Sequence, residues 1–131
     1  MAGMTLDAAQ AFARSWEAAW NAHDLDAVLA HFHDDVVFTS PLAPVMTGDP
    51  SGIVVGRDAL RRYWETGLAR VPDLRFEVLD VALGVDAVAL RYRNQAGRTV
   101  TEVAQFRDGK VAAAAAFYLD ADVLRQVGAT E

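Results

Sequence analysis

Residues 21–41 read NAHDLDAVLAHFHDDVVFTSP, and residues 56–64 read GRDALRRYW. In the first stretch Asp24 can cap a short helix whose apolar residues share one face, and the β-branched and aromatic residues of 36–39 then predict a strand. The second stretch predicts another helix. Residues 41–56 contain three prolines and three glycines, a composition typical of a long irregular loop at a lid or pocket rim. This order of helix, strand, loop and helix decides the fold.

The flanking segments extend the pattern in both directions. Residues 5–20 predict a helix capped by Thr5, and its buried stripe consists of Ala9, Phe12, Ala13, Trp16 and Trp20. From Leu74 onward the apolar period falls to two, and its parity shifts at residues 79–80, which predicts a β-bulge. Further strands are expected over residues 85–93, 98–107 and 110–119, with a hairpin at residues 108–109 and a helical tail after residue 120.

These elements predict one domain, residues 1–131, of the α+β class. We expect three N-terminal helices packed in a strongly curved, mixed or antiparallel β-sheet, followed by a short C-terminal helix. The five alanines at 112–116 have poor strand propensity, but the Asp-Gly turn before them and the flanking Val111, Phe117 and Tyr118 favour a strand.

The chain resembles the NTF2-like superfamily in its SnoaL-like and ketosteroid isomerase-like branch, among uncharacterised members. The residues that carry the resemblance are Trp16, Trp20, the NAHD of 21–24, the HDDVVF of 33–38, Pro41, the GRDALRRYW of 56–64 and the LRQVG of 124–128. The resemblance implies a cystatin-like cone around a single hydrophobic pocket. It does not select a reaction, because the superfamily includes isomerases, cyclases, epoxide hydrolases, dehydratases and proteins with no known activity.

Composition argues against several function classes. The net charge of −6 disfavours nucleic-acid binding, which requires a basic face. The chain has no cysteine, no basic leader before an apolar core, and no apolar run long enough to cross a membrane. We therefore expect a cytoplasmic protein with no cofactor. We expect no metal either, because the His and Asp residues of 31–35 lack a metal-binding spacing and read as a polar connection.

The catalytic positions of the family can be matched to individual residues of this chain, and several of these positions carry a different residue type here. The general base of the isomerase-like members, an Asp before a proline, corresponds to Ser40 here. Their oxyanion-binding Tyr corresponds to Trp16, and their protonated Asp corresponds to Glu102. The acid on the last strand of the SnoaL-like cyclases corresponds to the alanines of 112–116. Steroid isomerase chemistry is therefore not expected. Arg91 and Arg93 should lie on the outer face, so a hydrolase relay is not expected either.

Glu102 is the candidate catalytic residue. Strand alternation places it inside the fold with Val100 and Ala104, where desolvation would raise the pKa of its carboxyl and suit it to acid–base work. The alternatives are a structural role, bound to Trp16, Tyr92 or a water, and a solvent-facing edge position. The candidate ligand-binding residues are Trp16, Ser40, Tyr63, Tyr92 and Tyr118.

The sequence thus predicts a protein that binds a small apolar or aromatic molecule and forms a homodimer through the convex sheet face. Three alternatives stay open for its function. It is a cofactor-free acid–base enzyme of the isomerase, cyclase or hydratase type, a non-catalytic ligand-binding module, or a protein-interaction module.

Overall fold

The computed structural model describes residues 3–119 and contains four helices and six strands within that range. The helices are α1 (Leu6–Asn21), α2 (Leu25–Leu29), α3 (Ala43–Thr47) and α4 (Arg57–Arg70). The strands are β1 (Phe32–Thr39), β2 (Ile53–Val55), β3 (Glu77–Gly84), β4 (Ala87–Arg93), β5 (Thr99–Arg107) and β6 (Lys110–Tyr118). The α+β class is confirmed.

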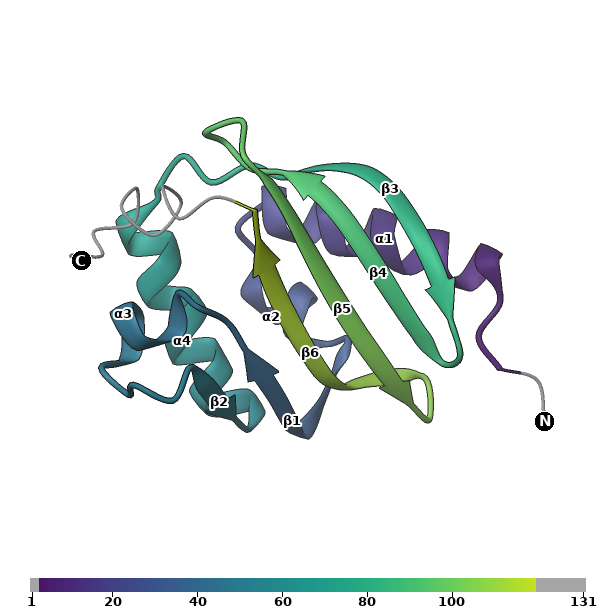
Figure 1. Cartoon of the computed structure of the whole chain (residues 1–131), viewed down its shortest axis with the longest axis horizontal. Coiled ribbons are helices and arrows are strands. Elements are labelled where there is room, and N and C mark those ends of the chain that lie inside the picture. Colours follow the sequence, from purple (N-terminus) through teal and green to yellow (C-terminus); the bar gives the residue numbers. More distant parts are fainter. Residues whose placement is uncertain (1–2, 120–131) are drawn as a thin grey trace.

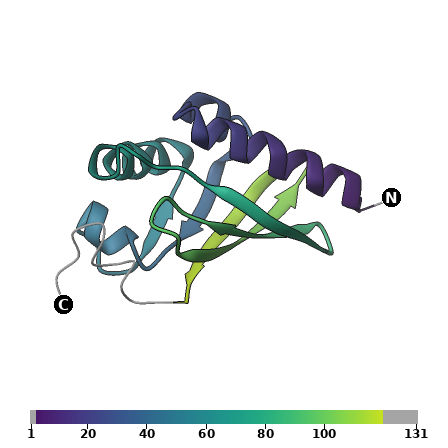
Figure 2. The same cartoon turned by 90° about the horizontal axis from the view of Figure 1, so that it is seen from above.

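All six strands form one sheet in the order β2-β1-β6-β5-β4-β3. The β1–β6 pair is parallel and the other pairs are antiparallel, so the sheet is mixed. The sheet curves, and α1 and α4 lie on its concave side (Figures 1 and 2). No helix in residues 3–119 combines the length and apolar character needed to cross a membrane.

The stretch 41–56 differs from the expected irregular loop. It contains α3, which has Pro44 in its first turn and ends at Gly48 with a φ of 80°, and it contains β2, which pairs with β1. Four helices rather than three therefore precede β3. Both added elements are short, five and three residues, and their stability depends on tertiary pairing rather than on local propensity. The predicted C-terminal helix lies outside the described residues.

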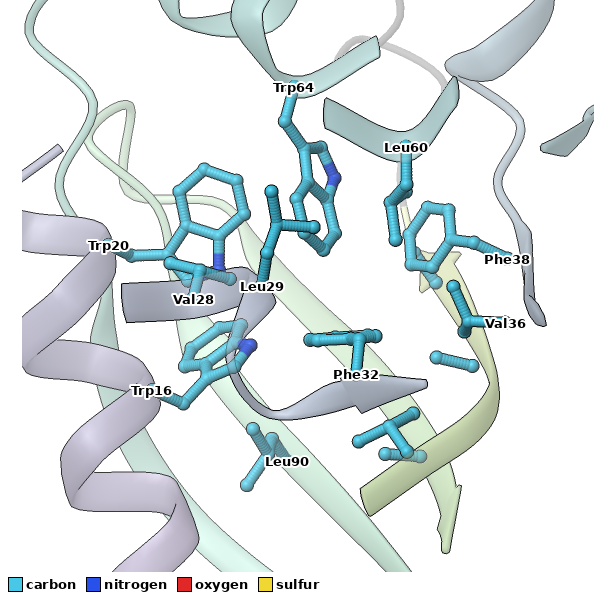
Figure 3. Close-up of a cluster of buried hydrophobic side chains, with 14 of the residues drawn as sticks. Trp16, Trp20, Val28, Leu29, Phe32, Val36, Phe38, Leu60, Trp64 and Leu90 are labelled. Atoms are coloured by element: carbon cyan, nitrogen blue, oxygen red, sulfur yellow. The ribbon is translucent and has the colours of Figure 1, made fainter. Parts of the chain in front are cut away.

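The first helix forms as predicted. The hydroxyl of Thr5 accepts a hydrogen bond from the backbone N–H of Ala8, and the predicted apolar stripe is buried in full. In Figure 3 the indoles of Trp16 and Trp20 extend from α1 into the core, where Trp64 from α4 meets Trp20 and Phe38 from β1 packs on Trp64. These side chains make the core strongly aromatic.

The strands also agree with the pattern predicted from the sequence, except that β3 begins later than expected. The predicted bulge is confirmed between Val78 and Asp80, and the alanine-rich segment forms β6. The left-handed φ values of Asp108 and Gly109, 52° and 80°, close the predicted hairpin. Strand β3 begins at Glu77 rather than Leu74, because the chain before it is bound by side chains of α1.

Candidate functional site

The concave side of the sheet encloses a cavity of about 100 Å³. Its fully buried lining comes from α1, α4 and the inner faces of β1, β4, β5 and β6, and consists of Trp16, Trp20, Phe38, Tyr63, Trp64, Tyr92, Val100, Glu102 and Ala116. Its partly exposed rim consists of Leu42, Met46, Gly67, Leu68, Val71, Leu74, Phe76, Asn94, Gln95 and Tyr118. The walls are thus mainly aromatic and aliphatic.

Glu102 is the buried carboxyl of this cavity. It lies on β5 between Leu90 of β4 and Ala116 of β6, and only 7% of it is exposed. Burial raises the pKa of Glu102 to about 8, while the nearby indole N–H of Trp16 opposes the increase. The carboxyl is therefore predominantly protonated at pH 7, and it can donate a hydrogen bond or a proton. The small side chain of Ala116 leaves space beside it.

Trp16 is held in an aromatic stack. Its ring lies parallel to Phe76, with centroids 5.4 Å apart, and it meets Tyr92 at a centroid distance of 4.9 Å. Its Nε1 is buried and, within residues 3–119, makes no hydrogen bond of regular geometry. The carboxyl of Glu102 nevertheless lies near enough for the indole N–H to lower its pKa. Glu102 is therefore the protein group that the Trp16 N–H faces.

The three tyrosines differ in their surroundings. Burial raises the pKa of Tyr63 to about 12, and it also raises the pKa values of Tyr92 and Tyr118. All three phenols therefore stay protonated across the physiological range. The carboxyl of Glu102, when charged, would add to each of these increases, so the four groups are near one another.

Ser40 contacts two of these tyrosines and is not among the cavity-lining residues. It is buried, and its hydroxyl accepts a hydrogen bond from the backbone N–H of Leu42. The hydroxyl also meets the phenols of Tyr63 and Tyr118, whose pKa increases it moderates. The structure thus assigns Ser40 contacts with two cavity tyrosines, and no place among the cavity-lining residues.

Side chains of α1 fix the position of Phe76. The amide of Asn21 donates to the carbonyl of Phe76 at 2.9 Å and accepts from its N–H at 2.8 Å. His23, with a φ of 55°, bonds the carbonyl of Leu74 at 2.8 Å. Glu17 accepts from the N–H of Val78 at 2.6 Å. The end of α1 therefore binds the chain that leads into β3, and this places the Phe76 ring against Trp16.

The structure brings five of the six predicted site residues together at the cavity: Trp16, Tyr63, Tyr92, Glu102 and Tyr118. The sequence interpretation missed Phe76, Asn94 and Gln95, and it did not include Trp20 and Trp64 among the candidate ligand-binding residues. The Asn21 position was a signal for Phe76, because a side chain amide that ends a helix can bind a neighbouring strand. Leu42 and Met46 do supply the rim expected from the 41–56 stretch.

The described charged side chains other than Glu102 lie outside the cavity lining. Arg91 and Arg93 pair with Asp80 and Glu77 on the outer face, as strand alternation predicted, so neither reaches Glu102. Residues 3–119 contain no group of His, Asp and Glu side chains placed to hold a metal ion. In the 31–35 segment, His31 bonds Ser15 and His33 bonds the carbonyl of Arg107, which are structural contacts.

Comparison with known proteins identifies relatives for this architecture. The SnoaL-like domain family matches residues 13–114. A SnoaL-like protein of unknown function from Burkholderia thailandensis E264 is 42% identical, with a TM-score of 0.86, over 91% of this chain and 100% of its own. Among functionally curated proteins, none matches the sequence.

More distant structures share the fold alone. An NTF2-like protein of unknown function from Burkholderia pseudomallei K96243 is 20% identical, with a TM-score of 0.72, over 96% of this chain and 100% of its own. IdmH from Streptomyces antibioticus, a proposed polyketide cyclase, is 21% identical, with a TM-score of 0.72, over 92% of this chain and 98% of its own.

Proposed function

The chain belongs to the SnoaL-like domain family, and from that premise we propose that it binds a small apolar molecule in the aromatic cavity and uses Glu102 for acid–base chemistry. One observation carries the proposal: the buried carboxyl of Glu102 lies in the wall of that cavity, where burial raises its pKa. Buried acids without a charged partner are rare, and a strongly raised pKa is typical of functional carboxyls.

A single carboxyl is sufficient for a reaction in which it donates one proton to the substrate and then takes one back from it. Protonated Glu102 can give its proton to one atom of the substrate. The resulting carboxylate, which is costly in an apolar wall, can then recover a proton from a second atom. The carboxyl regains from the substrate the proton that it gave, so no other titrating group is needed. This chemistry therefore favours an isomerase-type reaction over one that needs a separate acid and base.

Non-catalytic binding is the second candidate, and a different observation favours it. Apart from Glu102 and the tyrosines, the described lining has no titratable side chain. Ser40 replaces the base of the isomerase-like members, and the alanines of 112–116 replace the acid of the cyclase-like members. In this alternative Glu102 only orients the ligand.

Native mass spectrometry of gently purified protein tests ligand binding. We expect a discrete small-molecule adduct on the wild type and none on Ala116→Leu, in which a larger side chain occupies the cavity beside Glu102. The compound is then identified and incubated with wild type and Glu102→Gln. Conversion by the wild type alone supports the acid–base role, whereas an unchanged compound with both proteins supports non-catalytic binding. An adduct that persists on Ala116→Leu would place the ligand elsewhere.

We also propose that the outer sheet face forms a homodimer. One transverse row of this face consists of Ala82, Ala89, Val103, Ala115, Thr39 and Ile53, in neighbouring positions on six strands. These side chains are small or apolar and allow a second sheet to approach closely. Phe117, 55% exposed, lies on the same face beside Thr101. Multi-angle light scattering should give a dimer mass.

A further inference from the structure

The cavity has room for about one ring of a ligand. It measures about 100 Å³, which is smaller than an apolar cavity of roughly 150 Å³ that holds benzene. Sites that enclose drug-sized molecules measure roughly 300–1,000 Å³. Aromatic packing limits any widening, since Trp16, Phe76 and Tyr92 lie at centroid distances of 4.6–5.4 Å from one another. A single ring therefore fills the enclosed space, and the rest of any larger ligand must cross the rim.

Gly67 is the position at which the inward stripe of α4 lacks a side chain. Tyr63 and Trp64 precede it by four and three residues and line the cavity, and Val71 follows it by four residues and lies at the rim. Positions with this spacing share one face of a helix, and Figure 3 shows Trp64 extending from that face into the core. Every other residue of the described rim has a side chain, so Gly67 leaves a notch in the α4 wall.

Neither the backbone nor the packing requires a glycine at this position. Gly67 has no left-handed φ, unlike Gly48 and Gly56. A Cβ atom at position 67 would meet no atom of residues 3–119 within 4 Å, apart from its chain neighbours and the backbone of its own helix. Glycine inside a helix is less stabilising than alanine. The notch thus lowers the stability of α4 without any gain in packing, a local conflict that is typical of a functional position.

The surroundings of the notch are apolar. On α4 its neighbours are Leu68 and Val71, and α3, which packs against α4, brings Leu42 and Met46 to the same rim. These four side chains are uncharged and offer no N–H or O–H group. A polar substituent would lose hydration here without compensation, whereas a hydrocarbon would gain from burial. The space left by one missing side chain suits a narrow alkyl chain better than a second fused ring.

We propose that the ligand consists of one ring and an unbranched apolar chain, and that the chain leaves the cavity across Gly67. The ring occupies the aromatic cavity, and the chain lies in the notch against Leu68 and Val71. Gly67 is then a specificity-determining residue, because a large side chain at this position would exclude ligands that carry the chain. This inference rests on the proposed function, since it uses the same cavity, and it adds the shape of the ligand that the cavity selects.

The test compares butylbenzene with toluene and with tetralin, in which the same four added carbons form a second fused ring. Binding is followed by titration in ¹H–¹⁵N NMR, because all three tryptophans of the chain line the cavity and each gives an indole N–H signal. Each added CH₂ that is buried at least in part should increase affinity about two- to fourfold. We therefore expect the wild type to bind butylbenzene about tenfold more tightly than toluene, and more tightly than tetralin.

Two substitutions of Gly67 test the notch directly. Gly67→Ala should raise Tm by about 2–4 °C, because alanine stabilises the helix and its methyl group meets open space. Gly67→Leu should fill the notch, so toluene and butylbenzene should then bind with nearly equal affinity. The matched control is Ala69→Leu, which adds a leucine at an exposed position of the same helix, outside the cavity lining. This control should retain the preference for butylbenzene.

The outcomes separate this inference from the proposed function. A lower Tm for Gly67→Ala would show that position 67 has no open space, and would overturn the inference. Binding of tetralin by the wild type that equals or exceeds that of butylbenzene would also overturn it, as would a preference for butylbenzene that survives in Gly67→Leu. Absence of binding by all three compounds would overturn the inference as well, whereas a co-purifying adduct that Ala116→Leu removes would still support the proposed function.

Discussion

Replacement of Glu102 by Gln should make the protein more stable, by an amount that grows with pH. Glu102 has a pKa of about 8 in the folded state, against an ordinary value of 4.5 in the unfolded chain. Between these values the unfolded chain releases the proton and the folded protein keeps it, so the wild type loses stability as pH rises. Each pH unit costs about 1.4 kcal/mol. The 2.5 units from pH 4.5 to pH 7 therefore cost about 3 kcal/mol, and the loss levels off above pH 8.

Urea unfolding of both proteins at pH 5, 6, 7 and 8 measures this effect. The informative quantity is the difference in unfolding free energy between Glu102→Gln and wild type. Every other titrating group contributes equally to both proteins, so its contribution cancels in this difference. Burial lowers the pKa of His31, for example, and destabilises both proteins below pH 6.5. A matched control is Glu65→Gln, the same substitution at an exposed position on α4. A difference for Glu102→Gln that stays constant from pH 5 to pH 8 would refute the claim that burial keeps this carboxyl protonated.

Three further changes test the positioning of the cavity and the outer face. Asn21→Ala removes both hydrogen bonds to the backbone of Phe76 and should cost about 2–3 kcal/mol, a decrease in Tm of roughly 7–10 °C by circular dichroism. Asn21→Asp keeps the acceptor and should lose less. Ala116→Leu should change the unfolding free energy by less than about 3 kcal/mol while abolishing the adduct; a complete loss of folding would contradict the presence of free space there. Val103→Lys should convert the dimer to a monomer in light scattering, with an unchanged circular dichroism spectrum, and a persistent dimer would place the interface elsewhere.

The sequence predicted those parts of the fold in which local pattern and tertiary packing agree. The stripe of α1 and the alternation of β5 are examples, and the latter placed Glu102 inside correctly. The alanine-rich β6 was predictable for a different reason. Its turn residues, Asp108 and Gly109, fix the hairpin register regardless of the weak strand propensity that follows.

The sequence could not show features that depend on distant partners. Strand β2 has three residues and exists because β1 offers it an edge. Ser40 was expected near the ligand because it follows the end of β1, but it contacts Tyr63 and Tyr118 and is not among the cavity-lining residues, which no spacing rule reports. Phe76 was predicted as part of a strand. Its actual backbone bonds go to Asn21, 55 residues earlier in the chain.

The aromatic packing that stabilises the helices also limits what the cavity can do. Trp20 and Trp64 meet edge to face at 5.0 Å, and Phe32 and Phe38 pack on Trp64, so this part of the cone is occupied by the protein's own side chains. The cavity that remains is lined by Trp16 and Glu102 as well as by Trp20, Phe38 and Trp64. An indole can fill volume as well as any apolar ring, but it brings an N–H that needs an acceptor. Trp16 therefore limits the volume of the cavity and also places a polar group in its wall, beside Glu102.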